Sequence, residues 1–201
     1  MRKLFFMCFI VNFGSVHAAL FQGVSSSSFN NPTGSSGLEV NGVGTDQFTW
    51  GRGAPPSSLS YTGGGFDVNE NDGFVFGTLN YFNGVITPGS GANSVDLDVN
   101  LNFTAPSVIS EKFTFNLGLI NTVNSLDPNA SADIVNFDNV VPSNYFSSGG
   151  TNFTLEFLGF GTLTGAGFTV EDSFRVFEDN SATIDLVGRI TSTPSVVPIP
   201  A

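Results

Sequence analysis

The chain has 201 residues, of which 40% are hydrophobic and 11% charged, with 24 glycines and 22 phenylalanines. This length and composition support one sizeable hydrophobic core and leave no room for a second domain. They also exclude a mainly helical protein, because Phe, Val and Leu are spaced by Gly, Ser, Thr and Asn and no segment offers a long run of strong helix formers.

The first 18 residues have the features of a secretory signal peptide. Two basic residues, Arg2 and Lys3, precede an apolar run over residues 4–11, and small residues before a cleavage site end at Ala18. The apolar run is too short to span a bilayer core of roughly 30 Å. We therefore expect residues 1–18 to be removed by cleavage after Ala18, with cleavage after Ala19 as the alternative, and the remainder to be exported.

Cleavage would remove Cys8 and His17, the only cysteine and the only histidine. The exported chain would then lack disulfides, thiolate nucleophiles, imidazole bases, Ser-His-Asp triads and His- or Cys-ligated zinc. It would keep four basic residues against 17 acidic ones, a net charge of −13. A surface of this sign repels phosphate backbones, which argues against nucleic-acid binding, and it favours solubility and the binding of divalent cations.

The N-terminal part of the exported chain, residues 19–44, is rich in Ser, Asn and Gly and predicts an extended arm followed by a short strand near Val40. In the next segment Phe48 and Trp50 fall on one face of a strand, which ends at the proline-containing stretch 51–56. Trp50, the only tryptophan, has two alternative roles. Its large apolar area favours a packed core position, and the other role is a platform on which a sugar ring stacks.

An acidic loop follows the next predicted strand, residues 57–61. The loop carries four closely spaced oxygen-bearing side chains, Asp67, Asn69, Asn71 and Asp72. The spacing resembles the alternating ligands of a calcium loop, but Gly73 stands one place late and Thr78 occupies the position of the bidentate glutamate, so the segment is not an EF-hand. Two interpretations remain, a hairpin turn, which Asn, Asp and Gly favour, and a calcium site.

The remaining strands are predicted from aromatic and β-branched runs. Residues 73–86 read as a central strand and turn, and residues 95–103 alternate apolar and polar side chains throughout. Further strands are expected over residues 113–119, 132–137, 153–160, 168–177 and 182–190. About ten short strands separated by Gly, Asn and Pro predict an all-β fold over residues 19–192, an antiparallel two-sheet β-sandwich of jelly-roll-like form.

The last segment, residues 193–201, is a Pro-rich tether. It ends in the motif Val197-Pro198-Ile199-Pro200-Ala201. This motif resembles the start of a PEP-CTERM sorting signal of the VPLPA variety, which exosortase-type proteases of Gram-negative bacteria recognise. In that family an apolar helix and a basic cluster follow the motif. The resemblance leads us to expect that Ala201 is a truncation or processing point, and that the reading frame continues into about 20 apolar residues and then a basic cluster.

The body of the chain carries a second resemblance. Its motifs are FTWG at 48–51, SLSY at 58–61, FGTLNYFNG at 76–84, and NTVN at 121–124 followed by ADIV at 132–135. In this order they resemble choice-of-anchor K domains, bacterial surface domains with varied C-terminal anchors. The resemblance covers roughly residues 20–192 and implies a location and an architecture, but no catalytic residues.

Three functions follow as hypotheses. The first is an exported, non-enzymatic cell-surface or extracellular-matrix protein of a biofilm or envelope, which could join like subunits by adding its N-terminal arm to a neighbouring sheet edge. The second is a carbohydrate-binding module for a polysaccharide, which could depend on calcium and would use exposed aromatic side chains. Its candidates are Trp50, Tyr61, Tyr81 and Tyr145. The third, a hydrolase, would need paired carboxylates or a serine with Lys112, and since no spacing singles out an acid and a base, we expect no enzyme.

Overall fold

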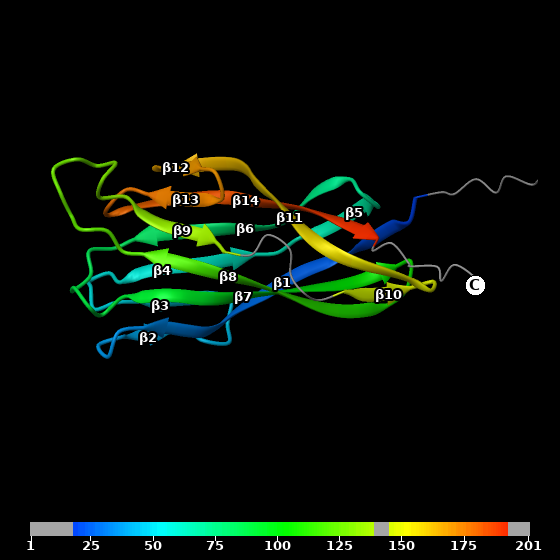
Figure 1. Cartoon of the computed structure of the whole chain (residues 1–201), viewed down its shortest axis with the longest axis horizontal. Helices are drawn as coiled ribbons and strands as arrows, with labels where there is room; N and C mark the ends of the chain where they lie inside the picture. The colour runs from blue at the N-terminus through cyan, green and yellow to red at the C-terminus, as the bar shows by residue number, and fades with distance from the viewer. Residues whose placement is uncertain (1–17, 139–144, 193–201) are drawn as a thin grey trace, which may run out of the picture.

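The computed structural model describes residues 18–138 and 145–192. These residues form two antiparallel seven-stranded sheets that pack against each other, with the strands running along the length of the molecule (Figure 1). The predicted all-β, two-sheet sandwich is confirmed. Within the described ranges no helix has the length and apolar character needed to cross a membrane.

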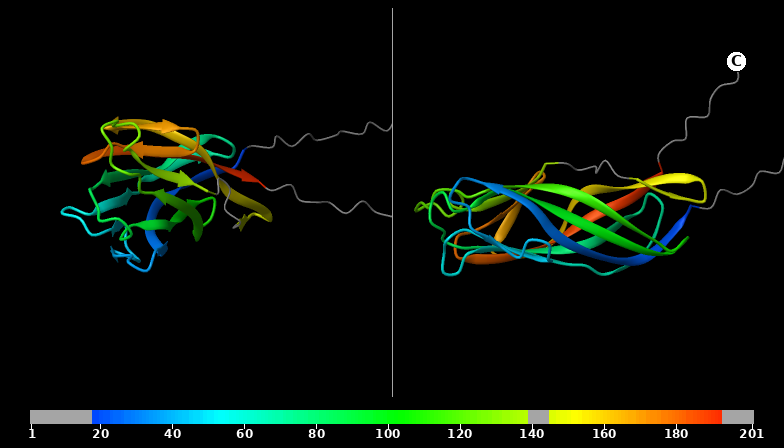
Figure 2. Two further views of the ribbon diagram at one scale, coloured as in Figure 1. Left: turned by 60° about the vertical axis from the view of Figure 1, so that its left-hand side comes forward. Right: turned by 90° about the horizontal axis from the view of Figure 1, so that it is seen from below.

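The two sheets are built from strands that are dispersed along the chain. In spatial order the first sheet contains β12 (Gly167–Val170), β13 (Ser173–Val176), β9 (Asp133–Phe137), β8 (Ile109–Ile120), β7 (Ala92–Ala105), β1 (Leu20–Gly34) and β5 (Gly65–Asn69). The second contains β10 (Phe146–Ser148), β11 (Thr151–Gly165), β14 (Asn180–Ser192), β6 (Gly73–Asn83), β4 (Ser57–Thr62), β3 (Gln47–Trp50) and β2 (Val40–Asn41). The chain therefore crosses repeatedly from one sheet to the other, as the further views in Figure 2 show.

Strict alternation places one face of each central strand in the core. In β7 the apolar side chains from Val95 to Phe103 are buried, as the sequence pattern predicts. On the opposite face Asp98 is also almost buried, but its carboxylate accepts hydrogen bonds from Asn30, Lys112 and Thr114 on the neighbouring strands. The outer face of the first sheet is thus joined by polar cross-strand contacts, and its inner face is apolar.

Aromatic rings fill the space between the sheets. Phe48 and Trp50 of the second sheet stack with ring centroids 5.5 Å apart, and Trp50 stacks in turn on Tyr81 at 5.6 Å. Phe115 of the first sheet stacks on Phe76 of the second at 5.8 Å. Stacked and edge-to-face pairs at these separations add to the stabilisation that comes from burying the rings. The predicted central strand is indeed central, since β6 lies between β14 and β4.

The predicted N-terminal arm is wrong. Residues 20–34 form β1, which pairs with β7 along its length and with β5 at its start. Phe21 and Phe29 are fully buried anchors, and small serines lie between them. The run of serines hid the strand because it shows no apolar alternation. Since β1 is paired along its length with β7 of its own sheet, it is not a free arm that could add to the sheet of a neighbouring copy.

Residues 168–177, expected as one strand, form the hairpin β12–β13. The chain reverses at Glu171, whose φ of 51° lies in the left-handed region. Left-handed turns are usually marked by Gly or Asn, and neither is present at this turn, which is why the sequence did not reveal it.

The outermost strands give little opportunity for pairing with another chain. The four edge strands β2, β10, β12 and β5 have only two, three, four and five residues. The longer β11 is interrupted by register shifts after Phe157 and after Phe160. Short and bulged edges of this kind hinder edge-to-edge association.

The aromatic layer gives a direct test of the packing. We expect Phe115→Ala to lower the free energy of unfolding by about 3–5 kcal/mol, because it leaves a cavity between the sheets. The control is Leu126→Ala, since Leu126 is fully exposed and its truncation should change stability by about 0.5 kcal/mol at most. Urea denaturation of the two variants measures the difference, and equal losses would contradict the assigned core.

Candidate functional site

The predicted processing sites lie at or beyond the borders of the described chain. Ala18 is exposed, and the adjacent Ala19 is half-buried, packs against the core and is followed directly by β1. The folded domain therefore begins where the signal peptide is expected to end. The sorting motif, residues 197–201, lies outside the described residues.

The acidic loop forms a tight turn that carries the chain from β5 of the first sheet to β6 of the second. The predicted hairpin is therefore wrong, because β5 pairs with β1 and β6 pairs with β14 and β4. The N–H of Asp72 donates to the carbonyl of Asn69 at 3.1 Å, and Asn71 has a φ of 70°. Two side-chain bonds hold the acidic groups, from the Asn69 amide to the Asp72 carboxylate at 3.1 Å and from Gln22 to the Asp67 carboxylate at 2.8 Å. The structure thus shows a turn at residues 69–72 that links the two sheets, and calcium binding by the four candidate ligands stays a prediction.

The same turn connects the beginning and the end of the described domain. The N–H of Glu70 donates to the carbonyl of Ala19 at 2.8 Å, and the N–H of Asn71 donates to the carbonyl of Ile190 at 2.9 Å. The beginning of β1 and the end of β14 consequently lie at the same end of the molecule, where Figure 1 shows the blue and red strands close together. The sequence carries no signal for this contact, because it joins segments that are far apart in the chain.

Of the two roles considered for Trp50, a core position and a platform for a sugar ring, the structure shows the core position. Its side chain is 1% exposed and lies between the rings of Phe48 and Tyr81, and its indole N–H donates to Asn121 at 2.9 Å. No face of the indole is open to a sugar ring. Tyr61 and Tyr81 are buried as well, and Tyr145 is 64% exposed.

The basic residues of the described chain are engaged with neighbouring side chains. Ion pairs join Arg52 to Glu39, Lys112 to Asp98 and Arg189 to Glu156. The fourth cation, Arg175, lies over the ring of Phe168. The surface charge is therefore dominated by carboxylates that lack a basic partner, in keeping with the acidic composition.

A buried carboxyl group lies between the sheets at Asp133 of β9. Its carboxylate accepts hydrogen bonds from the backbone and the hydroxyl of Thr122, at 2.6 and 3.0 Å, and from Tyr81. Burial raises the pKa of Asp133 to about 6, and the negative charge of Glu178 contributes in the same direction. Burial likewise raises the pKa of Glu178. Burial also raises the pKa of Tyr81, and the negative charge of Asp133 adds to this effect.

This pair of acids was not found from the sequence. Asp133 sits in an ordinary strand pattern and Glu178 in a turn, and only the packing of the sheets brings them near each other. Neither residue lines the two cavities described below. Asp133 is buried and Glu178 is half-buried, and each carboxylate accepts a hydrogen bond from a neutral neighbour, Thr122 and Asn124 respectively.

Two cavities open at the surface. One, of about 440 Å³, lies beside the β12–β13 hairpin and is lined by acidic residues, including Asp138, Glu171 and Asp172, and by Arg175. Within residues 18–138 and 145–192, however, no three or more His, Cys, Asp or Glu side chains are grouped so that they could hold a metal ion.

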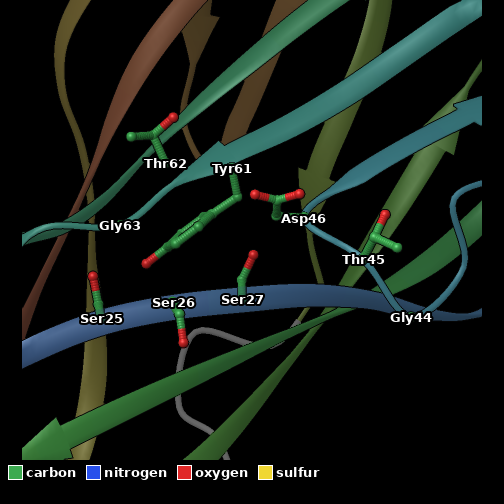
Figure 3. Close-up of a pocket in the computed structure, with 9 residues that line it drawn as sticks. All are labelled: Ser25, Ser26, Ser27, Gly44, Thr45, Asp46, Tyr61, Thr62 and Gly63. Carbon is green, nitrogen blue, oxygen red and sulfur yellow. The ribbon is translucent and has the colours of Figure 1, made fainter.

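The other cavity, of about 380 Å³, lies where β1 of the first sheet faces β4 and the loop before β3 of the second sheet (Figure 3). Its lining comes from three segments, residues 25–27, 44–46 and 61–63. In Figure 3 Ser27 and Asp46 direct their side chains into the space and the ring of Tyr61 lies across it. The hydroxyl of Ser27 is buried and has no hydrogen-bond partner among the described residues.

In comparisons with known proteins, no family model and no curated protein sequence matches this chain. The resemblance to choice-of-anchor K domains and to the sorting motif therefore stays a prediction from the motifs quoted above.

The turn at residues 69–72 leads to a prediction about calcium. Because the acidic loop is held by its own hydrogen bonds, we expect thermal melts in millimolar calcium and in chelator to coincide. A calcium site would instead stabilise the fold by about 2.7 kcal/mol at a hundredfold excess of calcium over Kd. A calcium-dependent rise in Tm that is lost in the double variant Asp67→Asn/Asp72→Asn would contradict the turn-only interpretation.

The buried Asp133 makes a prediction about pH. Since its folded pKa of about 6 exceeds the ordinary value of 3.8, the protonated form favours folding, and its contribution is full below pH 3.8 and lost as the pH rises through 6. We expect the resulting loss of stability, on the order of 1–3 kcal/mol, to disappear in Asp133→Asn. Urea denaturation across this pH range measures it. Asp172→Asn, at an exposed position, is the control and should retain the wild-type pH dependence.

Proposed function

We propose that the protein is an exported, non-enzymatic β-sandwich of the cell surface or extracellular matrix of a Gram-negative bacterium. The observation that carries this proposal is the turn at Glu70 and Asn71, which binds the backbone of both Ala19 and Ile190. A leader attached before Ala19 and a tether attached after residue 192 would leave the domain at the same end. The leader can then be removed, and the tether can hold the domain to the envelope, without any change in the core.

The distribution of charged groups supports a role without catalysis. The four cations of the described chain form ion pairs or a ring contact, and the 380 Å³ cavity carries a single carboxylate, that of Asp46. General acid–base chemistry needs at least one further group of suitable pKa next to the substrate. In the cavity the remaining titratable group is Tyr61, and burial raises its pKa to about 12.

The edges of the sheets favour a separate domain over a polymer in which each subunit adds a strand to the sheet of the next. β1 has a neighbouring strand on each side, and the outermost strands β2, β5, β10 and β12 are short. Contacts with like subunits or with matrix polysaccharide would then use the faces and loops of the sandwich. The sorting motif Val197–Ala201 would, by its resemblance, direct an exosortase-type protease to the far end of the tether.

Export can be tested with the chain as it stands. When residues 1–201 are expressed in a Gram-negative host, we expect the protein to leave the cytoplasm and its N-terminus to begin at Ala19, because the cleavage site is followed directly by the folded domain. Cell fractionation and N-terminal sequencing measure this. A matched chain that lacks residues 2–18 should stay in the cytoplasm. Recovery of the 201-residue chain from the cytoplasm with Met1 or Arg2 at its N-terminus would contradict the proposal.

A further inference from the structure

We propose that the cavity beside Ser27 is a binding site for a neutral polyhydroxylated ring, such as one saccharide unit. The site joins the two sheets, since β1 supplies one wall and the segments 44–46 and 61–63 supply the other (Figure 3). It is separate from Trp50, which is buried, and from the acidic β5–β6 turn.

The first support is an interruption in the pairing of β1. On the side away from β7, the N–H of Ser25 donates to Gly64 at 2.9 Å, and Phe29 exchanges bonds with Thr45 and Gly44 at 2.8 and 2.7 Å. Ser27 lies midway between these residues, so the two-residue period of a strand points its N–H and C=O to the same side. Among the described residues, no backbone group on that side bonds to Ser27. One donor and one acceptor therefore face the cavity.

The second support is the hydroxyl of Ser27. It is buried, it lacks a partner among the described residues, and it points into the cavity toward Asp46 and Tyr61. A buried hydroxyl without a partner is unfavourable. Rotation of the Ser27 side chain about its Cα–Cβ bond would bring the hydroxyl to a ligand hydroxyl and remove this cost. The Asp46 carboxylate adds a strong acceptor, while the Tyr61 hydroxyl is already engaged with the carbonyl of Phe76 at 2.5 Å.

These groups select the class of ligand. An anion is disfavoured by Asp46 and by the acidic chain, and a cation would find a single carboxylate. An apolar ligand would leave the polar groups of Ser27 unpaired. An added peptide strand is blocked at both ends, because Gly64 and Thr45 already occupy the edge of β1 over a span of about 13 Å at the usual strand rise. A compact ring whose hydroxyls both donate and accept satisfies all of these conditions.

The test is a titration of the purified exported protein with methyl glycosides of glucose, galactose, mannose and N-acetylglucosamine, followed by the amide resonances of Ser27, Thr45 and Asp46. We expect at least one glycoside to shift these resonances saturably. Ser27→Ala and Asp46→Asn should each raise its Kd about tenfold, because each variant removes a hydrogen bond to the ligand.

The matched control is Ser28→Ala, since Ser28 follows Ser27 on β1, lies outside the lining of the cavity and accepts a hydrogen bond from Asn30, so its truncation should leave Kd unchanged. Asp46 lies in an exposed loop, so Asp46→Asn keeps the test valid if Ser27→Ala fails to fold. The proposal is overturned if no glycoside shifts these resonances, if Ser27→Ala and Asp46→Asn both bind like the wild type, or if calcium or inorganic phosphate saturates the site instead. Export is measured separately, so a negative titration would leave the proposed location unaffected.

Discussion

The packing of aromatic rings between the two sheets is the interaction on which the rest of this structure depends. Rings from both sheets interlock, and one continuous series runs from Phe29 through Phe48, Trp50 and Tyr81 to Phe174. Residues 18–201 contain no cysteine, so the burial of these rings must supply the stability that other small domains obtain from disulfides. The high phenylalanine content thus serves the core, and aromatic composition by itself does not indicate a ligand-binding surface.

A core filled with rings makes each polar group inside it conspicuous. The Trp50 indole, the Tyr61 hydroxyl and the Asp133 carboxylate all have hydrogen-bond partners, as burial requires. Among the described residues three buried side-chain atoms lack one, Oγ of Ser27, Oδ1 of Asn83 and Nε of Arg175. Ser27 combines this with an open backbone edge and a cavity. That coincidence, more than the size of the cavity, distinguishes the site from the rest of the surface.

The two ends of the described domain, Ala19 and Ile190, lie together at one end of the sandwich. The turn at Glu70 and Asn71 holds Ala19 and Ile190 through backbone bonds, so this turn contributes to the closure of the sandwich. A tether at this end would leave the opposite end of the sandwich farthest from the envelope. The cavity beside Ser27 lies along the side of the molecule, where β1 passes from its pairing with β5 to its contact with the Gly44–Thr45 loop.

The sequence by itself determined those features that depend on residues close together in the chain, namely the strands and their buried faces. The alternation from Val95 to Phe103 predicted a strand with one buried face, and the repetition of such patterns predicted two packed sheets. The β1 strand escaped prediction because its serines carry no local pattern, and its two buried anchors, Phe21 and Phe29, pack against partners distant in the chain. The cavity was equally invisible, since it needs residues 25–27, 44–46 and 61–63 side by side. Periodicity is a local property of the chain, whereas strand pairing and the gaps it leaves are decided when distant segments pack together.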